Sequence, residues 1–144
     1  MSNDLKKLHE ADFNLWLEEV KSAIANQNFE NMDWDNLIDE IDDMGASQKR
    51  ALDSYMKRLI EHLLKLKFWH QEQERNQRGW RGEVNAFRDS INKIIKKNPS
   101  LKNYLVEEYE DNFRSATRRV GELFEIPKDC FWELEKTMDL EFYG

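Results

Sequence analysis

The sequence predicts an all-α protein, a single-domain antiparallel bundle of about five helices covering residues 1–144. The chain has 144 residues, which is the length of one domain. It contains only 5 Gly and 2 Pro, too few for the many turns of a β-sandwich or for long loops. Its apolar residues recur at helical spacing, so each helix presents one apolar stripe that must be buried against another helix.

The first half of the chain predicts three helices. The first covers about residues 11–26, and the second begins after Asp33, a residue type that caps helix N-termini. Gly45 is expected to end or kink this second helix, with Ser47 as the next cap. The third carries the most regular stripe, from Ala51 to Leu66, so we expect it to be the central helix.

The second half predicts two more helices and a short tail. Residues 71–79 contain no apolar side chain and are expected to form an exposed connection. The fourth helix carries a stripe from Trp80 to Ile95 and stops at Asn98, because Pro99 disfavours helical geometry in the residue before it. Ser100 is expected to cap the fifth helix, and residues 131–138 to form one or two further turns.

Several classes of protein have no support in the sequence. No apolar run approaches the roughly 18 residues of a membrane span, and no signal-like stretch follows the N-terminus, so we expect a soluble cytoplasmic protein without membrane contact. The lone Cys130 excludes an intrachain disulfide and a cysteine metal cage. Phosphate-cradling loops and hydrolase or zincin motifs are missing from the sequence, which therefore predicts neither a cofactor nor a metal.

Charge is segregated along the chain, whose net charge is −7. Residues 1–46 hold 3 basic and 12 acidic side chains, whereas residues 65–97 hold 9 basic and 4 acidic ones. Two interpretations stay open: a basic surface for an anionic partner, or acidic and basic helices that pack beside one another. The second is favoured, because a net-acidic chain binds nucleic acid poorly unless its basic residues share one face.

Four polar residues border the apolar stripes on the same side of their helices: Asp12, Glu19, Glu40 and His62. We expect them to form a polar cluster, either a network that holds helices in register or a metal or acid-base site. The paired Glu-x-x-His motif of di-iron bundles is missing, since Leu59 stands three residues before His62. The register network is therefore favoured.

Arg58 and His62 are weak candidates for catalysis. They stand four residues apart on one helix, so that the arginine could stabilise phosphate charge while the imidazole moves a proton. The spacing is one residue short of the R-x4-6-H pattern of helical ribonuclease domains of the HEPN type. The other histidines, His9 in a frayed start and His70 after the third helix, are expected at the surface.

A second candidate site is an anion-binding segment around Trp80. Arg78 and Arg81 flank this indole, with Arg75 just before, and an indole among guanidinium groups can stack a base or hold a phosphate. The alternative is that Trp80 packs into the core while the arginines pair with the acidic helices.

Stretches along nearly the whole chain resemble the domain of unknown function 29 (DUF29) family, small bacterial proteins abundant in cyanobacteria. The matching stretches are Asp12-Phe13, Leu15-Trp16-Leu17-Glu18, Asp33-Trp34, Asn36-Leu37, Glu40-Ile41, Met44-Gly45, Ser47, Arg50-Ala51-Leu52, Ser54, Leu59 to Lys65, Arg78-Gly79-Trp80 and Pro99-Ser100-Leu101. The resemblance implies an all-helical fold and no established activity. The family's recurrent polar positions map to Asp12, Glu40, His62, Arg78 and Trp80, whereas His70 stands where similar proteins tend to carry glutamine.

We therefore expect a non-enzymatic module that binds a protein partner through an exposed aromatic or charged face. One alternative is a phosphodiester-cleaving hydrolase or nuclease that uses His62 with Arg58 or nearby carboxylates. Another is nucleic-acid binding through the segment from Arg75 to Arg81. Apolar surface left over on the fourth or fifth helix would indicate a homodimer.

Overall fold

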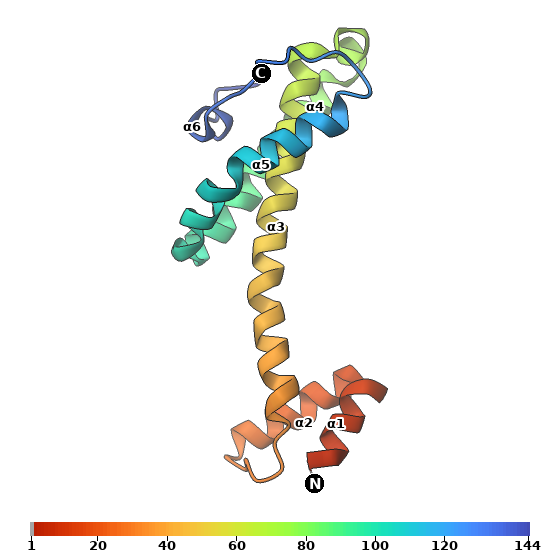
Figure 1. The fold of residues 1–144 in the computed structure, drawn as a ribbon, viewed down its shortest axis with the longest axis vertical. Helices are drawn as coiled ribbons and strands as arrows, with labels where there is room; N and C mark the ends of the chain where they lie inside the picture. Colours follow the sequence, from red (N-terminus) through yellow and green to blue (C-terminus); the bar gives the residue numbers. More distant parts are fainter. Residues whose placement is uncertain (1) are drawn as a thin grey trace. The chain divides into compact units, whose positions relative to one another are not determined.

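A computed structural model describes residues 2–144, with side chains from residue 4 onward, and throughout this range the regular structure is helical, without a strand. The elements are α1 (Ser2–Ala11), α2 (Phe13–Ala25), α3 (Trp34–Phe68), α4 (His70–Lys97), the 3₁₀ turn η1 (Pro99–Leu101), α5 (Lys102–Val120) and α6 (Leu134–Thr137) (Figure 1). The predicted all-α class is confirmed, and α6 confirms the further turn expected within residues 131–138. No helix in the described range has the length and apolar character needed to span a bilayer.

Contacts divide the chain into two compact units, Met1–Ser47 (the N-terminal unit) and Gln48–Gly144 (the C-terminal unit). Each unit has an apolar core of its own. That the two make up a single domain stays a prediction.

The core of the N-terminal unit is small. Trp16, Val20 and Met32 are its buried residues. The indole Nε1 of Trp16 donates to Oδ2 of the fully buried Asp33 at 3.2 Å, and the other carboxylate oxygen of Asp33 accepts from the backbone N–H of Asn36 at 3.4 Å. Asp33 therefore both caps α3, as predicted, and ties α3 to α2.

The first predicted helix, about residues 11–26, corresponds to α2, but the sequence did not predict the separate helix α1 before it. Asp12 divides the two helices, because its side chain accepts from the backbone N–H of Leu15 at 3.1 Å and so caps α2. His9 consequently lies in a helix rather than in a frayed start. Its ring contacts that of Trp16 edge-on, with centroids 4.8 Å apart.

The predicted break at Gly45 and Ser47 was also wrong, because α3 runs through both residues. A Cβ added to Gly45 would meet nothing within 4 Å, so this position imposes no special backbone geometry. A glycine inside a helix costs about 1 kcal/mol relative to alanine, which is too little to end a helix with strong segments on both sides.

Residues 71–79 are helical and not a connection, since α4 begins at His70. The segment is rich in Gln, Glu and Arg, which are good helix formers even without an apolar stripe. Two side-chain contacts support it: Nδ2 of Asn76 donates to the carbonyl of Glu72 at 3.0 Å, and Nε2 of Gln73 donates to the carbonyl of Leu66 in α3. The turn between α3 and α4 is reduced to Trp69.

The C-terminal unit is built around the second part of α3. Helix α4 runs antiparallel to it, because Tyr55 contacts Phe87 (ring centroids 6.3 Å apart) while Lys65, further along α3, lies over the earlier Trp80 at 5.9 Å. Helix α5 returns in the direction of α3, as Figure 1 also shows. The α3 stripe is buried between these helices, which confirms it as central; its buried members are Leu52, Met56, Leu59, Ile60, Leu63, Leu64 and Leu66.

Two details of α5 differ from the prediction. Ser100 does not cap it, since residues 99–101 form the turn η1 and the N-cap is Leu101, without a side-chain hydrogen bond. The helix ends at Val120, and Leu123, which the spacing of apolar residues after Leu101 would have kept on the buried face of a longer helix, is 56% exposed.

A segment near the C-terminus closes the unit by binding a buried arginine. Arg88 of α4 is fully buried, and its Nε and Nη2 donate to the backbone carbonyls of Thr137 (2.9 Å) and Phe142 (2.6 Å). The hydroxyl of Tyr143 donates to Oδ1 of Asn85 at 2.9 Å. Burial lowers the pKa of Arg88 from its ordinary value, because the charged guanidinium has lost its hydration.

Candidate functional site

One face of α3 in the N-terminal unit carries apolar side chains that are at least half exposed. Trp34, Ile38 and Ile41 follow one another at spacings of four and three residues, so they share a helix face, and we call them the apolar row. The exposed fractions are 50%, 55% and 53%. Such a contiguous exposed row is typical of an interaction surface.

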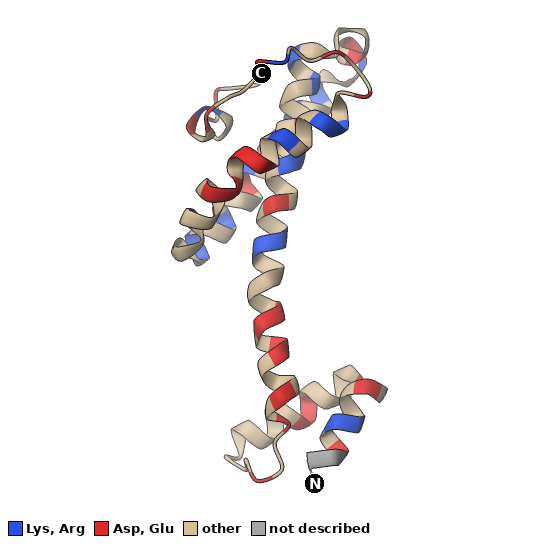
Figure 2. Ribbon diagram, in the orientation of Figure 1, with Lys and Arg blue, Asp and Glu red and all other residues tan. Residues whose placement is uncertain are grey.

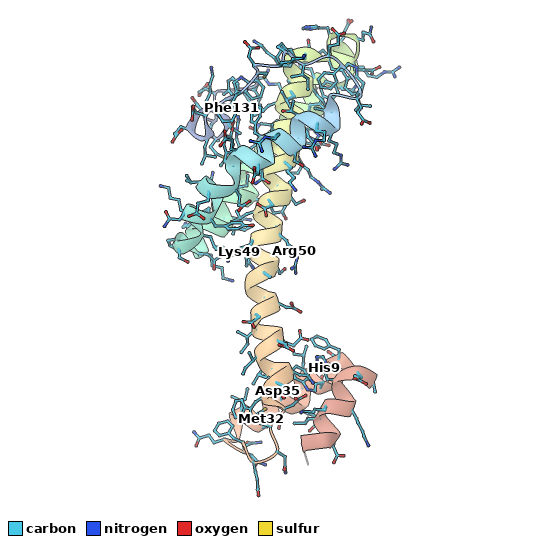
Figure 3. The ribbon with its side chains drawn as sticks, in the orientation of Figure 1. His9, Met32, Asp35, Lys49, Arg50 and Phe131 are labelled. Carbon is cyan, nitrogen blue, oxygen red and sulfur yellow. The ribbon has the colours of Figure 1, made fainter. Side chains whose placement is uncertain are left out.

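A line of carboxylates runs beside the apolar row. Asp35, Asp39 and Asp42 each follow a row member by one residue, which places them about 100° further around the helix, and we call them the acidic row. Asp35 accepts from Nζ of Lys6 at 3.5 Å, whereas Asp39 and Asp42 have no ion pair within the residues described. Figure 2 shows acidic residues along this part of α3, and Figure 3 labels Asp35.

Further apolar exposure occurs across the same unit. Its exposed large apolar residues are Phe13, Leu15, Leu17, Ile24, Phe29, Trp34, Ile38, Ile41 and Met44. Many of them belong to stripes that the sequence predicts to be buried. The leftover apolar surface thus lies mainly on α2 and α3, whereas α5, the fifth predicted helix, exposes Val106.

Two of the three predicted polar residues of the N-terminal unit, Asp12 and Glu40, have local partners of their own. Asp12 caps α2, and Glu19 is exposed. Oε1 of Glu40 lies 2.9 Å from Nε2 of His9, which Figure 3 labels. His9 is therefore the partner that sequence reasoning missed, because it placed this residue at a frayed terminus.

His62 has its partners in the C-terminal unit. Its Nδ1 lies 2.7 Å from the carbonyl oxygen of Arg58, and its Nε2 contacts Oε2 of Glu83 on α4. The Arg58 carbonyl and the Glu83 carboxylate are both hydrogen-bond acceptors. His62 can therefore donate to the two of them at once only when each of its ring nitrogens carries a proton. The contact with Glu83 connects α3 to α4, whereas the contact with Arg58 lies within α3. Convergence of His62 with Asp12, Glu19 and Glu40 stays a prediction.

The segment around Trp80 divides into a packed indole and exposed arginines. Trp80 is partly buried against the core and stacks on Trp69, with centroids 5.8 Å apart and planes 14° apart. Arg75, Arg78 and Arg81 are exposed. Arg78 and Arg81 line a hollow of about 520 Å³, where the guanidinium carbon of Arg81 lies 4.0 Å from the ring centre of Tyr143.

Among residues 4–144, no group of three or more His, Cys, Asp or Glu side chains is arranged to hold a metal ion. Burial raises the pKa of the Cys130 thiol, with a smaller contribution from Asp129, so this cysteine is a poor nucleophile near neutral pH.

Tyr104 gives a pH-dependent prediction. Its hydroxyl donates to Oδ2 of Asp53 at 2.6 Å, and this bond, more than burial, raises the pKa of Tyr104 to about 12. The pKa of a tyrosine in the unfolded chain is about 10, so the unfolded chain loses this proton at a lower pH than the folded chain. The protonated Tyr104 hydroxyl therefore stabilises the folded state fully below pH ~10, and this stabilisation is lost as the pH rises through 12. Urea unfolding of Tyr104→Phe should lack this part of the alkaline loss of stability, and Tyr55→Phe should retain it. Equal alkaline losses in wild type and Tyr104→Phe would contradict the prediction.

The comparisons with known proteins agree with the resemblance in the sequence. A family model described as "Domain of unknown function DUF29" matches residues 8–143, which is nearly the whole chain. No curated protein and no solved structure matches the chain.

Proposed function

Since this chain belongs to the DUF29 family, whose description carries no activity, we propose a function from its own surface: it is a non-enzymatic interaction module that binds a basic amphipathic helix of another protein. The observation that carries the proposal is the exposed apolar row of Trp34, Ile38 and Ile41 beside the acidic row.

The apolar row supports helix binding because the N-terminal unit buries little apolar surface by itself. Its core contains three buried residues, Trp16, Val20 and Met32. Complete burial of one large apolar side chain contributes about 1.5–3 kcal/mol. Burying the exposed halves of the three side chains of the apolar row against a partner would therefore contribute about 2–4 kcal/mol to the binding free energy. Spacings of four and three residues match the apolar face of a partner helix laid alongside.

The acidic row supports a partner of positive charge. Residues 1–46 hold 12 acidic and 3 basic side chains, so an acidic helix would be repelled and a basic one attracted. A helix with Lys or Arg on one flank of its apolar face would meet both rows at once. The charges are expected to set specificity and association rate, and the apolar contacts to supply the affinity.

The contacts of His62 favour binding over catalysis. A general acid or base must reach the substrate with a ring nitrogen, and both nitrogens of His62 already have protein partners in Arg58 and Glu83. A nuclease that uses His62 with Arg58 would have to break one of these contacts. Nucleic-acid binding through Arg75, Arg78 and Arg81 remains an alternative, with the steep dependence on salt that phosphate contacts produce.

Binding can be tested with the full chain carrying ¹³C-labelled isoleucine methyl groups. The probe is a synthetic helical peptide of about 18 residues with leucine on one face and lysine on the other. We expect the methyl resonances of Ile38 and Ile41 to shift, with a dissociation constant of about 1–100 μM. A peptide with glutamate in place of lysine should bind at least about tenfold more weakly, because the acidic row repels it.

The variants Ile38→Gln and Ile41→Gln should each weaken lysine-peptide binding at least about fivefold. Val106→Gln is the matched control, because Val106 is also exposed (55%) but lies on α5. Equal weakening by Val106→Gln, or equal affinity for the two peptides, would overturn the proposal. If the unliganded chain dimerises in sedimentation and Ile38→Gln abolishes the dimer, the face belongs to a second copy and the proposal is again overturned.

A further inference from the structure

We propose that a hollow in the C-terminal unit, between α3 and α5, binds a small phosphate-bearing anion. The hollow has a volume of about 330 Å³ and is lined by Arg50, Asp53, Ser54, Lys57, Arg58 and Arg119. Four of these six side chains are cationic. We call this hollow the basic pocket, and Figure 3 labels Arg50 on α3.

The helical period gathers the donors on one side of α3. Arg50, Ser54 and Arg58 follow one another at intervals of four residues, and Lys57 lies one residue before Arg58. Arg119 reaches the same hollow from α5, where its Nε lies 3.6 Å from Oε1 of the buried Glu61. Two helices therefore supply the cations, and an ion pair between the same helices positions one of them.

The four positive charges of the basic pocket are compensated only in part, by the carboxylate of Asp53 in the lining and by Glu61, which pairs with Arg119. Within the part of the chain that the structure describes, no carboxylate forms an ion pair with Arg50, Lys57 or Arg58. Asp53, the acidic residue of the lining, has other partners: Oδ2 accepts from the Tyr104 hydroxyl at 2.6 Å, and Oδ1 accepts from Nδ2 of Asn112 at 3.1 Å. This incomplete compensation occurs in a chain with more acidic than basic residues, 29 against 22.

The donors match the chemistry of a phosphate group. Arginine presents paired N–H donors that fit two phosphate oxygens, lysine adds a mobile charge, and the hydroxyl of Ser54 can donate to a third oxygen. A cavity of about 330 Å³ is at the small end of ligand sites, which span roughly 300–1,000 Å³. It suits one or two phosphate groups rather than a large ligand.

A small anion is favoured over a nucleic-acid strand. The same helix α5 carries four carboxylates, Glu107, Glu108, Glu110 and Asp111, and the chain has a net charge of −7. A long polyanion would be repelled by these charges, whereas a small anion would meet only the local cations. The basic pocket lies outside the residues proposed to bind a helix, so either proposal can fail without the other.

The test is calorimetric titration of the full chain with sodium pyrophosphate at constant ionic strength. We expect saturable binding with a dissociation constant of about 10 μM to 1 mM. Arg58→Gln and Lys57→Gln should each weaken it about tenfold. Arg114→Gln is the matched control, because Arg114 is an exposed arginine of α5 that pairs with Asp111 at 3.2 Å, and it should leave the affinity unchanged. Far-ultraviolet circular dichroism checks that each variant remains helical.

Two further titrations identify the source of the phosphate. Inorganic phosphate in place of pyrophosphate reports whether a single group suffices, and ribose 5-phosphate reports whether an organic body adds affinity; saturable binding of either that Arg58→Gln weakens supports the site. A single-stranded DNA of about 20 nucleotides that binds more tightly than pyrophosphate would overturn the small-anion assignment. Absence of saturable pyrophosphate binding, or equal weakening by Arg114→Gln, would overturn the site itself.

Discussion

Replacing Trp16 with alanine is expected to unfold residues 1–47 while residues 48–144 stay folded. Trp16 is fully buried and is one of three buried apolar residues in the core of its unit, so little packing remains without it. Loss of a buried tryptophan costs about 3–5 kcal/mol, and Asp33, also fully buried, would lose its indole donor. Amide hydrogen exchange should show lost protection in α1 and α2 and retained protection in α4 and α5.

The matched control is Trp34→Ala. It removes the same type of side chain from the same unit, but Trp34 is 50% exposed, so we expect a loss of no more than about 1 kcal/mol and unchanged protection in α2. Equal loss of protection in the two variants would show that the Trp16 core does not hold the unit together. Loss of protection throughout α4 and α5 in Trp16→Ala would contradict the independence of the two units.

Replacing Arg88 with leucine is expected to release the segment around residues 137–143. The change removes the donors that satisfy the carbonyls of Thr137 and Phe142, and each buried acceptor left without a partner costs about 1–3 kcal/mol. Relief from burying a charge offsets part of this, because burial already lowers the pKa of Arg88. We expect a net loss of about 2–4 kcal/mol in urea unfolding and faster proteolysis after residue 132.

Two variants test the cause of this loss. Arg88→Lys keeps the charge but cannot reproduce two donors at fixed angles, so an intermediate loss is expected. Arg81→Leu removes an exposed arginine that lies 4.0 Å from the ring centre of Tyr143, and its effect should be below about 1 kcal/mol. A more stable Arg88→Leu variant would mean that the desolvation of the charge outweighs the two hydrogen bonds.

The buried face of α3 is the part of the fold that the sequence predicts best. Leu52, Met56, Leu59 and Leu63 recur at helical spacing and are all fully buried. Periodicity succeeds here because α3 is covered by neighbouring helices in the C-terminal unit. The stripes of the N-terminal unit have the same spacing, yet Ile38 and Ile41 are exposed, since periodicity cannot tell whether a partner for a face is present in the same chain.

The helix boundaries were harder to predict, because residues that break or cap helices, such as glycine and serine, are weak signals. Gly45 was expected to break a helix, but its cost is small beside the strength of the flanking segments. Residues 71–79 were expected to be a loop because they lack apolar side chains. Their Gln, Glu and Arg side chains instead extend α4, with Gln73 bonded to the end of α3.

The prediction of candidate site residues was limited because it was based on a helical wheel. The wheel gives the direction of a side chain and not the identity of the neighbour that it meets. Glu40 contacts His9 and His62 contacts Glu83, and the wheel indicated neither of these partners. The basic pocket was detectable in part, because Arg50, Ser54 and Arg58 share a helix face, but Arg119 is distant in sequence and only the fold adds it.

The buried arginine of α4 has a consequence for the order of events during translation. Its two carbonyl acceptors lie 49 and 54 residues further along the chain, so they leave the ribosome well after α4 has been made. Translation proceeds at about 5–20 residues per second, so the acceptors are synthesised roughly 3–10 s after the arginine. During this time the guanidinium has neither acceptor, even if the neighbouring helices form at once. Nascent chains stalled after α4 has been made, but before the two acceptors have been made, should therefore expose an incomplete interior to chaperones. The mature protein no longer exposes it.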